Sequence, residues 1–83
     1  MQTYLEKRQP AKNVARFYRM SVMPNLFGEW TLYREWGRIG QGGQVRMDWF
    51  EDENQAVAAL ITLEASKRQR GYWVEPQQLA MFG

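Results

Sequence analysis

The stretch Arg34-Glu35-Trp36-Gly37-Arg38-Ile39-Gly40 is the part of the sequence that decides the fold. It closes a run over residues 30–39 that is rich in the aromatic and β-branched types that favour strands. Residues 40–43 follow with three glycines, which supply the positive φ angles of a tight hairpin. The sequence therefore predicts that residues 44–50 return antiparallel beside residues 30–39.

Two further strands are expected on the N-terminal side of this hairpin. Residues 14–23 place Val14, Tyr18, Met20 and Val22 on one parity and end at Pro24, which is typical of a strand. A short edge strand is predicted around residues 4–5, before a loop that contains a proline. In the connection over residues 24–28, we expect the two large apolar side chains to be buried anchors.

A helix is predicted after the hairpin. Asp52 can accept a hydrogen bond from the free amides of the first turn, and residues 56–68 are dense in helix-forming types. The apolar stripe at helical spacing should lie on the sheet; it consists of Ala56, Leu60, Leu63 and Lys67. Gly71 stands where a left-handed terminating residue belongs, and residues 72–74 can then add a last short strand or an apolar clip.

These elements predict an α+β fold, an antiparallel sheet with one long helix packed on one face. With 83 residues the chain is expected to form a single domain over residues 1–74, followed by a flexible C-terminal tail over residues 75–83. We expect Trp30, Trp49 and Trp73 to lie in the core.

The composition excludes several classes of active site. The chain has no cysteine and no histidine, so it cannot build a Ser-His-Asp or Cys-His site or a structural zinc site. The acidic residues at 48 and 51–53 do not have the spacing of a calcium loop, and helix capping explains them better. The glycines at 37–43 match neither phosphate-loop motif. We therefore expect a non-enzymatic protein without cofactor or metal.

The chain also lacks an apolar run of the ~20 residues that a membrane helix requires, and its first residues lack the apolar centre of a secretion signal. A cytoplasmic monomer is expected. The net charge of +2 says little, but arginines recur along the predicted strands at 16, 19, 34, 38 and 46. The planar guanidinium suits phosphate recognition. Solvated strand faces explain the same pattern equally well.

The candidate site is centred on Trp36. Arg34, Trp36 and Arg38 alternate along one strand and share a face, while Gly37 keeps the strand surface low. An exposed indole beside cations can stack on an unpaired base, and arginine can hold a phosphate, with Arg46 of the return strand as a further contact. The alternative, that the indole of Trp36 simply belongs to the core, stays open.

Several blocks of the sequence together resemble the WGR domain, which occurs in poly(ADP-ribose) polymerases and in free-standing small bacterial proteins. They are Arg16-Phe17-Tyr18, Leu26-Phe27-Gly28-Glu29-Trp30, the stretch from Arg34 to Gly40, Gly43-Gln44-Val45-Arg46, and Lys67-Arg68-Gln69-Arg70-Gly71-Tyr72. In the polymerases this domain helps to recognise DNA breaks. The resemblance implies that Trp36 takes a terminal sugar or base and that Arg38 takes a phosphate or an interdomain contact. No catalytic domain or zinc finger accompanies the module in this chain.

The leading hypothesis from the sequence is a small nucleic-acid-binding module for DNA ends, nicks or structured DNA. Its site residues are Trp36, Arg38, Arg34, Gly37 and Arg46. The alternative is a protein-protein interaction adaptor that uses the same patch, because tryptophan and arginine are also common anchors of protein interfaces.

Overall fold

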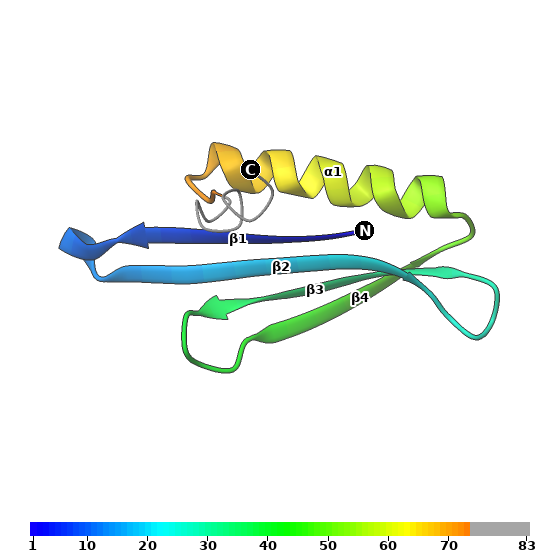
Figure 1. Ribbon diagram of the computed structural model, residues 1–83, viewed down its shortest axis with the longest axis horizontal. Coiled ribbons are helices and arrows are strands. Elements are labelled where there is room, and N and C mark those ends of the chain that lie inside the picture. Colours follow the sequence, from blue (N-terminus) through cyan, green and yellow to red (C-terminus); the bar gives the residue numbers. More distant parts are fainter. Residues whose placement is uncertain (74–83) are drawn as a thin grey trace, which may run out of the picture.

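A computed structural model of the chain describes residues 1–73 and has two layers, a four-stranded sheet and a helix that lies along it (Figure 1). The strands follow the order β1-β2-β3-β4, and each neighbouring pair is antiparallel. The α+β fold predicted from the sequence is confirmed. The elements are β1 (Gln2–Gln9), a 3-10 turn η1 (Pro10–Lys12), β2 (Val14–Pro24), β3 (Trp30–Arg38), β4 (Gln44–Phe50) and α1 (Glu53–Gln69).

The strand bounds agree closely with the prediction, with one difference at the N-terminus. β4 has the predicted limits, and β3 ends one residue early because Ile39 begins the turn and donates its amide to the carbonyl of Ala15, at 2.9 Å. β1 is longer than the short strand expected, since all eight of its residues pair with β2. Pairing with a neighbouring strand thus overrides the polar composition of residues 6–9.

The core lies between the sheet and α1. The helix-facing parity of the strands contributes Leu5, Met20 and Leu32, which are at most 1% exposed. Ala56 and Leu60 of the predicted helical stripe are completely buried against them, so the expected contact of this stripe with the sheet is confirmed. This face carries the main hydrophobic cluster of the described residues, and α1 covers it.

Both ends of α1 are capped as the sequence predicts. The Asp52 side chain accepts a hydrogen bond from the amide of Gln55 at 2.8 Å. At the other end Gly71 has a φ of 96°, and the amide of Tyr72 reaches back to the carbonyl of Lys67 at 3.0 Å. This turn directs the chain back to the sheet, where the amide and carbonyl of Trp73 pair with the backbone of Glu6 in β1.

Two of the three tryptophans expected in the core are exposed instead. Trp49 has 59% of its surface accessible and Trp73 has 48%, whereas Trp30 packs against the core as expected. Trp49 lies on the strand parity that faces away from α1, and a single helix can cover only one face of a sheet. Trp73 follows the helix and lies at the outer edge of β1.

The expected burial of the loop between β2 and β3 is also wrong. Leu26 is 98% exposed and Phe27 is 86% exposed. The side-chain oxygen of Asn25 accepts hydrogen bonds from the amides of Phe27 and Glu29 at 2.9 and 3.0 Å. This polar side chain closes the turn locally, so the loop does not need apolar anchors in the core.

Residue 74 and the predicted tail over residues 75–83 lie outside the described residues, so the domain limits stay a prediction. Within residues 1–73, no helix combines the length and the apolar character that crossing a membrane demands. The same residues contain no group of three acidic side chains placed to hold a metal ion. Of the acidic residues considered for such a site, Asp48 binds two arginines and Asp52 caps α1.

We predict that Gly43→Ala destabilises the fold by about 1–3 kcal/mol, the usual cost of forcing an atom into packed surroundings. A Cβ at Gly43 would overlap the carbonyl oxygen of Trp36 and lie 3.0 Å from the ring of Phe17. The free energy of unfolding in urea measures the effect.

The matched control is Gly42→Ala, because a Cβ at Gly42 meets no atom within 4 Å. We expect this neighbouring variant to keep its stability or to gain up to about 1 kcal/mol through a less flexible unfolded chain. Equal losses in the two variants would show that the close approach at Gly43 does not constrain the hairpin.

Candidate nucleic-acid interface

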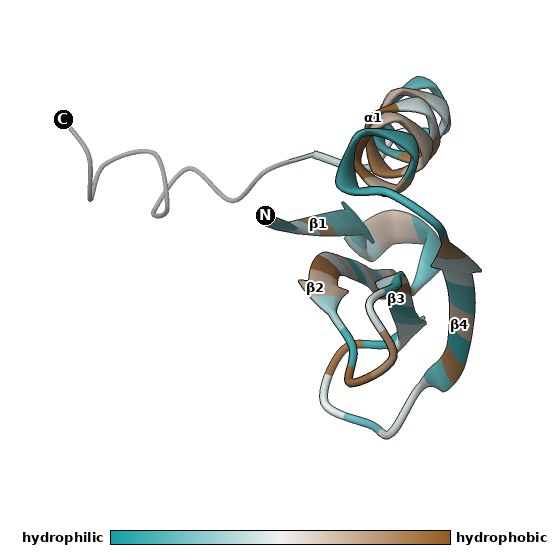
Figure 2. Cartoon of the chain, turned by 90° about the vertical axis from the view of Figure 1, so that its right-hand side faces the viewer, coloured by the Kyte–Doolittle hydropathy of each residue, from teal (hydrophilic) through white to brown (hydrophobic). Residues whose placement is uncertain are grey.

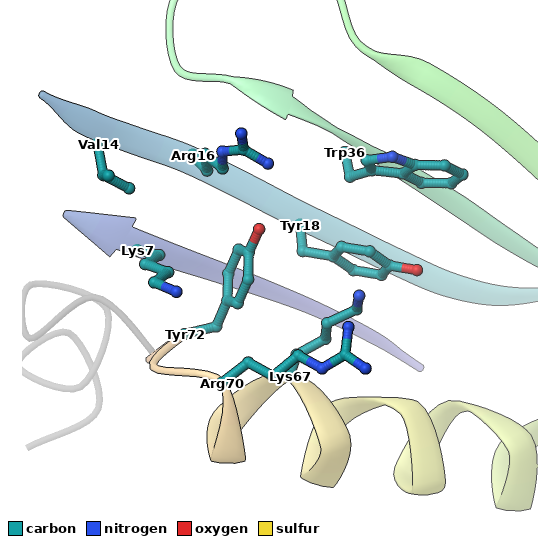
Figure 3. A pocket seen from close by; sticks show the side chains of 8 residues that line it. All are labelled: Lys7, Val14, Arg16, Tyr18, Trp36, Lys67, Arg70 and Tyr72. Atoms are coloured by element: carbon teal, nitrogen blue, oxygen red, sulfur yellow. The ribbon is translucent and has the colours of Figure 1, made fainter. Parts of the chain in front are cut away.

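A pocket of about 440 Å³ opens between the C-terminal end of α1 and the helix-facing side of the sheet (Figure 3). Its side chains come from β1, β2, β3, α1 and the segment after α1. Most of them are either cationic or aromatic, and none is a carboxylate. We call it the cationic pocket; its lining residues are Lys7, Val14, Arg16, Tyr18, Trp36, Lys67, Arg70 and Tyr72.

Strand register explains why these side chains meet. Arg16 lies directly opposite Lys7 of β1 and opposite Arg38 of β3. Two residues further along β2, Tyr18 lies opposite Trp36. All these positions share the parity that faces α1. Because the helix ends above this part of the sheet, Lys67 of its last turn and Arg70 just after it add two cations to the same face (Figure 3).

Aromatic rings form one wall of the pocket. The rings of Tyr18 and Trp36 stack with centroids 5.6 Å apart and planes 13° apart. Tyr72 approaches Tyr18 edge-on at 6.2 Å. Tyr18 is only 3% exposed, whereas Trp36 is partly buried and packs against the core while it also lines the pocket. Trp36 therefore combines a structural contact with access to the pocket.

The four cations of the pocket have no carboxylate partner among the described residues. Ion pairs within residues 1–73 involve other arginines, and none of them involves Lys7, Arg16, Lys67 or Arg70. The ammonium of Lys67 instead lies 4.6 Å from the centroid of the Tyr18 ring, a cation–π contact. Like charges that gather without counter-charges disfavour the fold, and a bound anion can relieve this repulsion.

The pKa of Lys67 reflects this surrounding. Burial lowers the pKa of Lys67, and the positive charges of Arg70 and Arg34 lower it further. A perturbed lysine in a pocket is more common at functional sites than elsewhere, although structural causes also occur. Here the pocket geometry and the lowered pKa of Lys67 indicate the same thing, a site with an excess of positive charge.

The structure separates the predicted arginines into different environments. Arg34 and Arg46 both bind Asp48, with nitrogen–oxygen distances of 3.2 and 3.3 Å. The Arg34 side chain is only 14% exposed and also donates to the hydroxyl of Tyr18 at 3.4 Å. Arg34 therefore supports the aromatic wall from beside it, and its charge is shared with a carboxylate.

Arg38 and Gly37 also differ in their surroundings. Arg38 is exposed and donates to the backbone and side-chain oxygens of Asn13, at 3.2 and 3.0 Å. It lies opposite Arg16, and no ion pair within residues 1–73 involves it. Gly37 lies on the opposite parity and faces away from the pocket. A Cβ at Gly37 would lie 3.0 Å from the Cα of Gly43, so the hairpin backbone accounts for this glycine.

Sequence reasoning found Trp36 but missed most of the residues around it. The sequence places Lys7 in a loop after the first strand, Tyr18 in a strand, Lys67 and Arg70 at the end of the helix, and Tyr72 in a last strand or apolar clip. A signal is present in the sequence, because Lys67 in the last turn of the helix and Arg70 three residues on share a face, and that face carries the stripe that packs on the sheet. The strand register, which brings Arg16 beside Trp36, was not readable from the sequence.

We predict that Arg70→Gln raises the pKa of Lys67, because it removes the second cause of its lowering while burial remains. In the native protein we expect Lys67 to titrate below its ordinary value of 10.5. Between the lowered pKa of Lys67 in the folded chain and its ordinary pKa in the unfolded chain, the unfolded chain binds more protons. The free energy of unfolding should therefore rise with pH across this window. Nuclear magnetic resonance of the lysine Cε signals measures the titration.

The control is Arg68→Gln, which removes a charge from the same helical turn. Arg68 binds Glu64 at 2.9 Å and does not line the pocket. We expect this variant to leave the pKa of Lys67 unchanged. If both variants shifted the Lys67 pKa equally, the local repulsion assigned to Arg70 would be refuted.

Comparison with known proteins assigns the chain to a family. A model of the WGR domain matches residues 1–78. The uncharacterized protein y4dW of Sinorhizobium fredii (strain NBRC 101917 / NGR234) is 47% identical over 73 residues, which are 88% of this chain and 36% of that protein. The chain thus spans about a third of the length of this curated relative. No solved structure matches the chain. The chain belongs to the WGR family, whose domain is a small binding module commonly associated with nucleic acids.

Proposed function

We propose that this protein is a non-enzymatic module that binds DNA ends, nicks or other structured DNA in the cationic pocket. The observation that carries the proposal is the group of four cations without carboxylate partners, among residues 1–73, around the stacked rings of Tyr18 and Trp36. Phosphate supplies the missing negative charge, and a nucleotide also offers a flat surface to the rings.

The aromatic wall favours a nucleotide that is not fully enclosed in a duplex. The ring of Tyr18 already stacks on the ring of Trp36, with the two centroids 5.6 Å apart. A paired and stacked internal base has no free face to offer, whereas a terminal or splayed nucleotide exposes its base or sugar. Stacking of one base on a protein ring contributes about 1–3 kcal/mol. This reasoning supports a preference for ends and nicks over continuous duplex.

The cations around the wall are arranged to follow a phosphate backbone. Arg38 and Arg16 are adjacent across β3 and β2, and Lys7 continues the row on β1. Lys67 in the last turn of α1 and Arg70 directly after it face this row (Figure 3). Of the residues proposed from the sequence, Trp36 and Arg38 keep direct roles in this arrangement. Arg34, Arg46 and Gly37 have structural roles in this proposal. Asp48 binds both arginines, and Gly37 allows the close approach of the hairpin backbone.

The chemistry of the pocket suits binding and not catalysis. Its lining contains no carboxylate, histidine or cysteine, so it has no general base or soft nucleophile that works near neutral pH. Lysine and arginine donate hydrogen bonds to phosphate oxygens without transferring protons. We therefore place the role of the pocket in recognition.

We predict that Trp36→Ala loses about 1–3 kcal/mol of affinity for nicked duplex and loses the preference for nicks over intact duplex. Arg38→Ala should weaken binding to every duplex alike, because a phosphate contact carries no structural preference. Fluorescence anisotropy titrations with nicked, blunt and circular duplexes measure both effects. Circular dichroism and urea unfolding verify that Trp36→Ala, which removes a ring stacked on Tyr18, remains folded.

The salt dependence gives an independent and better matched test. Arg16→Gln should reduce the slope of log affinity against log salt by about 0.9, the value for one phosphate contact. The control is Arg19→Gln, three residues along the same strand but on the other face, where the guanidinium lies 3.5 Å from Glu35. Equal slope changes in the two variants would contradict the pocket. If the native protein binds no duplex at low salt, a protein-interaction adaptor becomes the better hypothesis.

A further inference from the structure

The outer edge of β4 is open to pairing. β4 is the last strand of the sheet, and none of its seven residues is fully buried. At the opposite edge, the backbone of Trp73 pairs with Glu6 of β1 at 2.8 and 2.9 Å. Within residues 1–73 no such segment pairs with β4, which also lacks proline, lysine and bulges, and whose charged residues, Arg46 and Asp48, already bind each other.

The two faces of β4 differ in chemistry, as the alternating colours along this strand show (Figure 2). Val45, Met47 and Trp49 lie on the face away from α1 and are 50%, 48% and 59% exposed. The other parity carries Arg46 and Asp48, which have opposite charges and lie two residues apart. Met47 is the midpoint of both the apolar set and the charged pair.

We propose that two copies of this chain pair through β4, antiparallel, about a two-fold axis at Met47. In this register Met47 faces the partner's Met47, and Val45 faces the partner's Trp49. On the other face Arg46 lies opposite the partner's Asp48, and the symmetry repeats this ion pair. Arg34 keeps its own bond to Asp48, since it binds the other carboxylate oxygen, Oδ2.

Charge selects this register over its neighbours. A two-fold axis moved to Arg46 would place the two copies of Arg46 opposite each other, and an axis moved to Asp48 would oppose two carboxylates. Like charges directly opposite each other on paired strands are destabilising, whereas unlike charges and aromatic–aliphatic pairs are stabilising. Shifts by single residues would pair apolar with charged faces. The sequence of β4 is therefore self-complementary in one register.

The pairing would form one continuous eight-stranded sheet from two four-stranded sheets. The two-fold axis is perpendicular to the sheet, so both helices lie on the same side. Both cationic pockets then face that side as well, which would allow one nucleic acid to contact two pockets; this consequence alone rests on the proposed function. This proposal differs from the monomer expected from the sequence.

Substitutions at Met47 test the axis directly. Met47→Lys and Met47→Glu each place like charges face to face across the axis, and we expect each to weaken self-association at least about tenfold, a change of about 1.4 kcal/mol. An equimolar mixture of the two variants should associate again as a heterodimer, because lysine then faces glutamate. Sedimentation equilibrium measures the mass against concentration, and the native protein should rise from 9.9 kDa towards twice that mass.

The control is Ile61→Lys, a charge at an apolar site of similar exposure, 53%, on α1. It should dimerise like the native protein. The proposal fails if the native protein keeps its monomer mass at the highest concentration, if Met47→Lys dimerises unchanged, or if the mixed variants remain monomeric. Titrations of short duplexes with Met47→Glu separate the two proposals, because the pocket can bind DNA whether or not β4 pairs.

Discussion

The packing of a single helix on one face of a four-stranded sheet determines the rest of this structure. Ala56 and Leu60 are completely buried against the sheet and anchor α1 there. With 17 residues α1 is about 25 Å long, whereas the 11 residues of β2 span about 36 Å. The helix therefore cannot cover the whole face. The uncovered end becomes the cationic pocket, and no helix of the described residues lies over the other face of the sheet, which carries Trp49.

The distribution of charge matters more than its sum, which is only +2. Asp48 draws Arg34 and Arg46 into one cluster on β3 and β4, where its carboxylate offsets one of the two positive charges. The cationic pocket lies in the same sheet face but has no carboxylate in its lining. The pKa of Lys67 is lowered because this ammonium is partly buried near further cations. One face thus holds an arginine–aspartate cluster in which a carboxylate offsets part of the positive charge, beside a pocket in which none does.

The sequence predicted the elements well because their signals are local. The turn before β4, the Asp52 cap and the left-handed Gly71 all act within a few residues, and the structure contains each of them. Of the three glycines in that turn, however, Gly40 alone has the predicted positive φ, at 86°. The parity that places Arg34, Trp36 and Arg38 on one face is equally local and is confirmed by the register.

The features that the sequence could not predict depend on long-range contacts. The ion pair of Asp48 with Arg34 depends on the register of β3 and β4. The contact of Lys67 with Tyr18 depends on the position of α1. Trp49 was misplaced for a related reason. Its apolar character predicts burial, but it lies on the strand parity that the one helix of residues 1–73 does not cover.

We propose that nucleic acid binds at the end of α1, on the helix-facing side of the sheet. Mapping by nuclear magnetic resonance, with isotope-labelled protein and a nicked duplex, tests it most directly. Binding in the cationic pocket should shift the signals of the Trp36 indole N–H, of Tyr18 and Tyr72, and of the Lys67 side chain. Shifts confined to the opposite face, at Arg19 or Tyr33 for example, would contradict it.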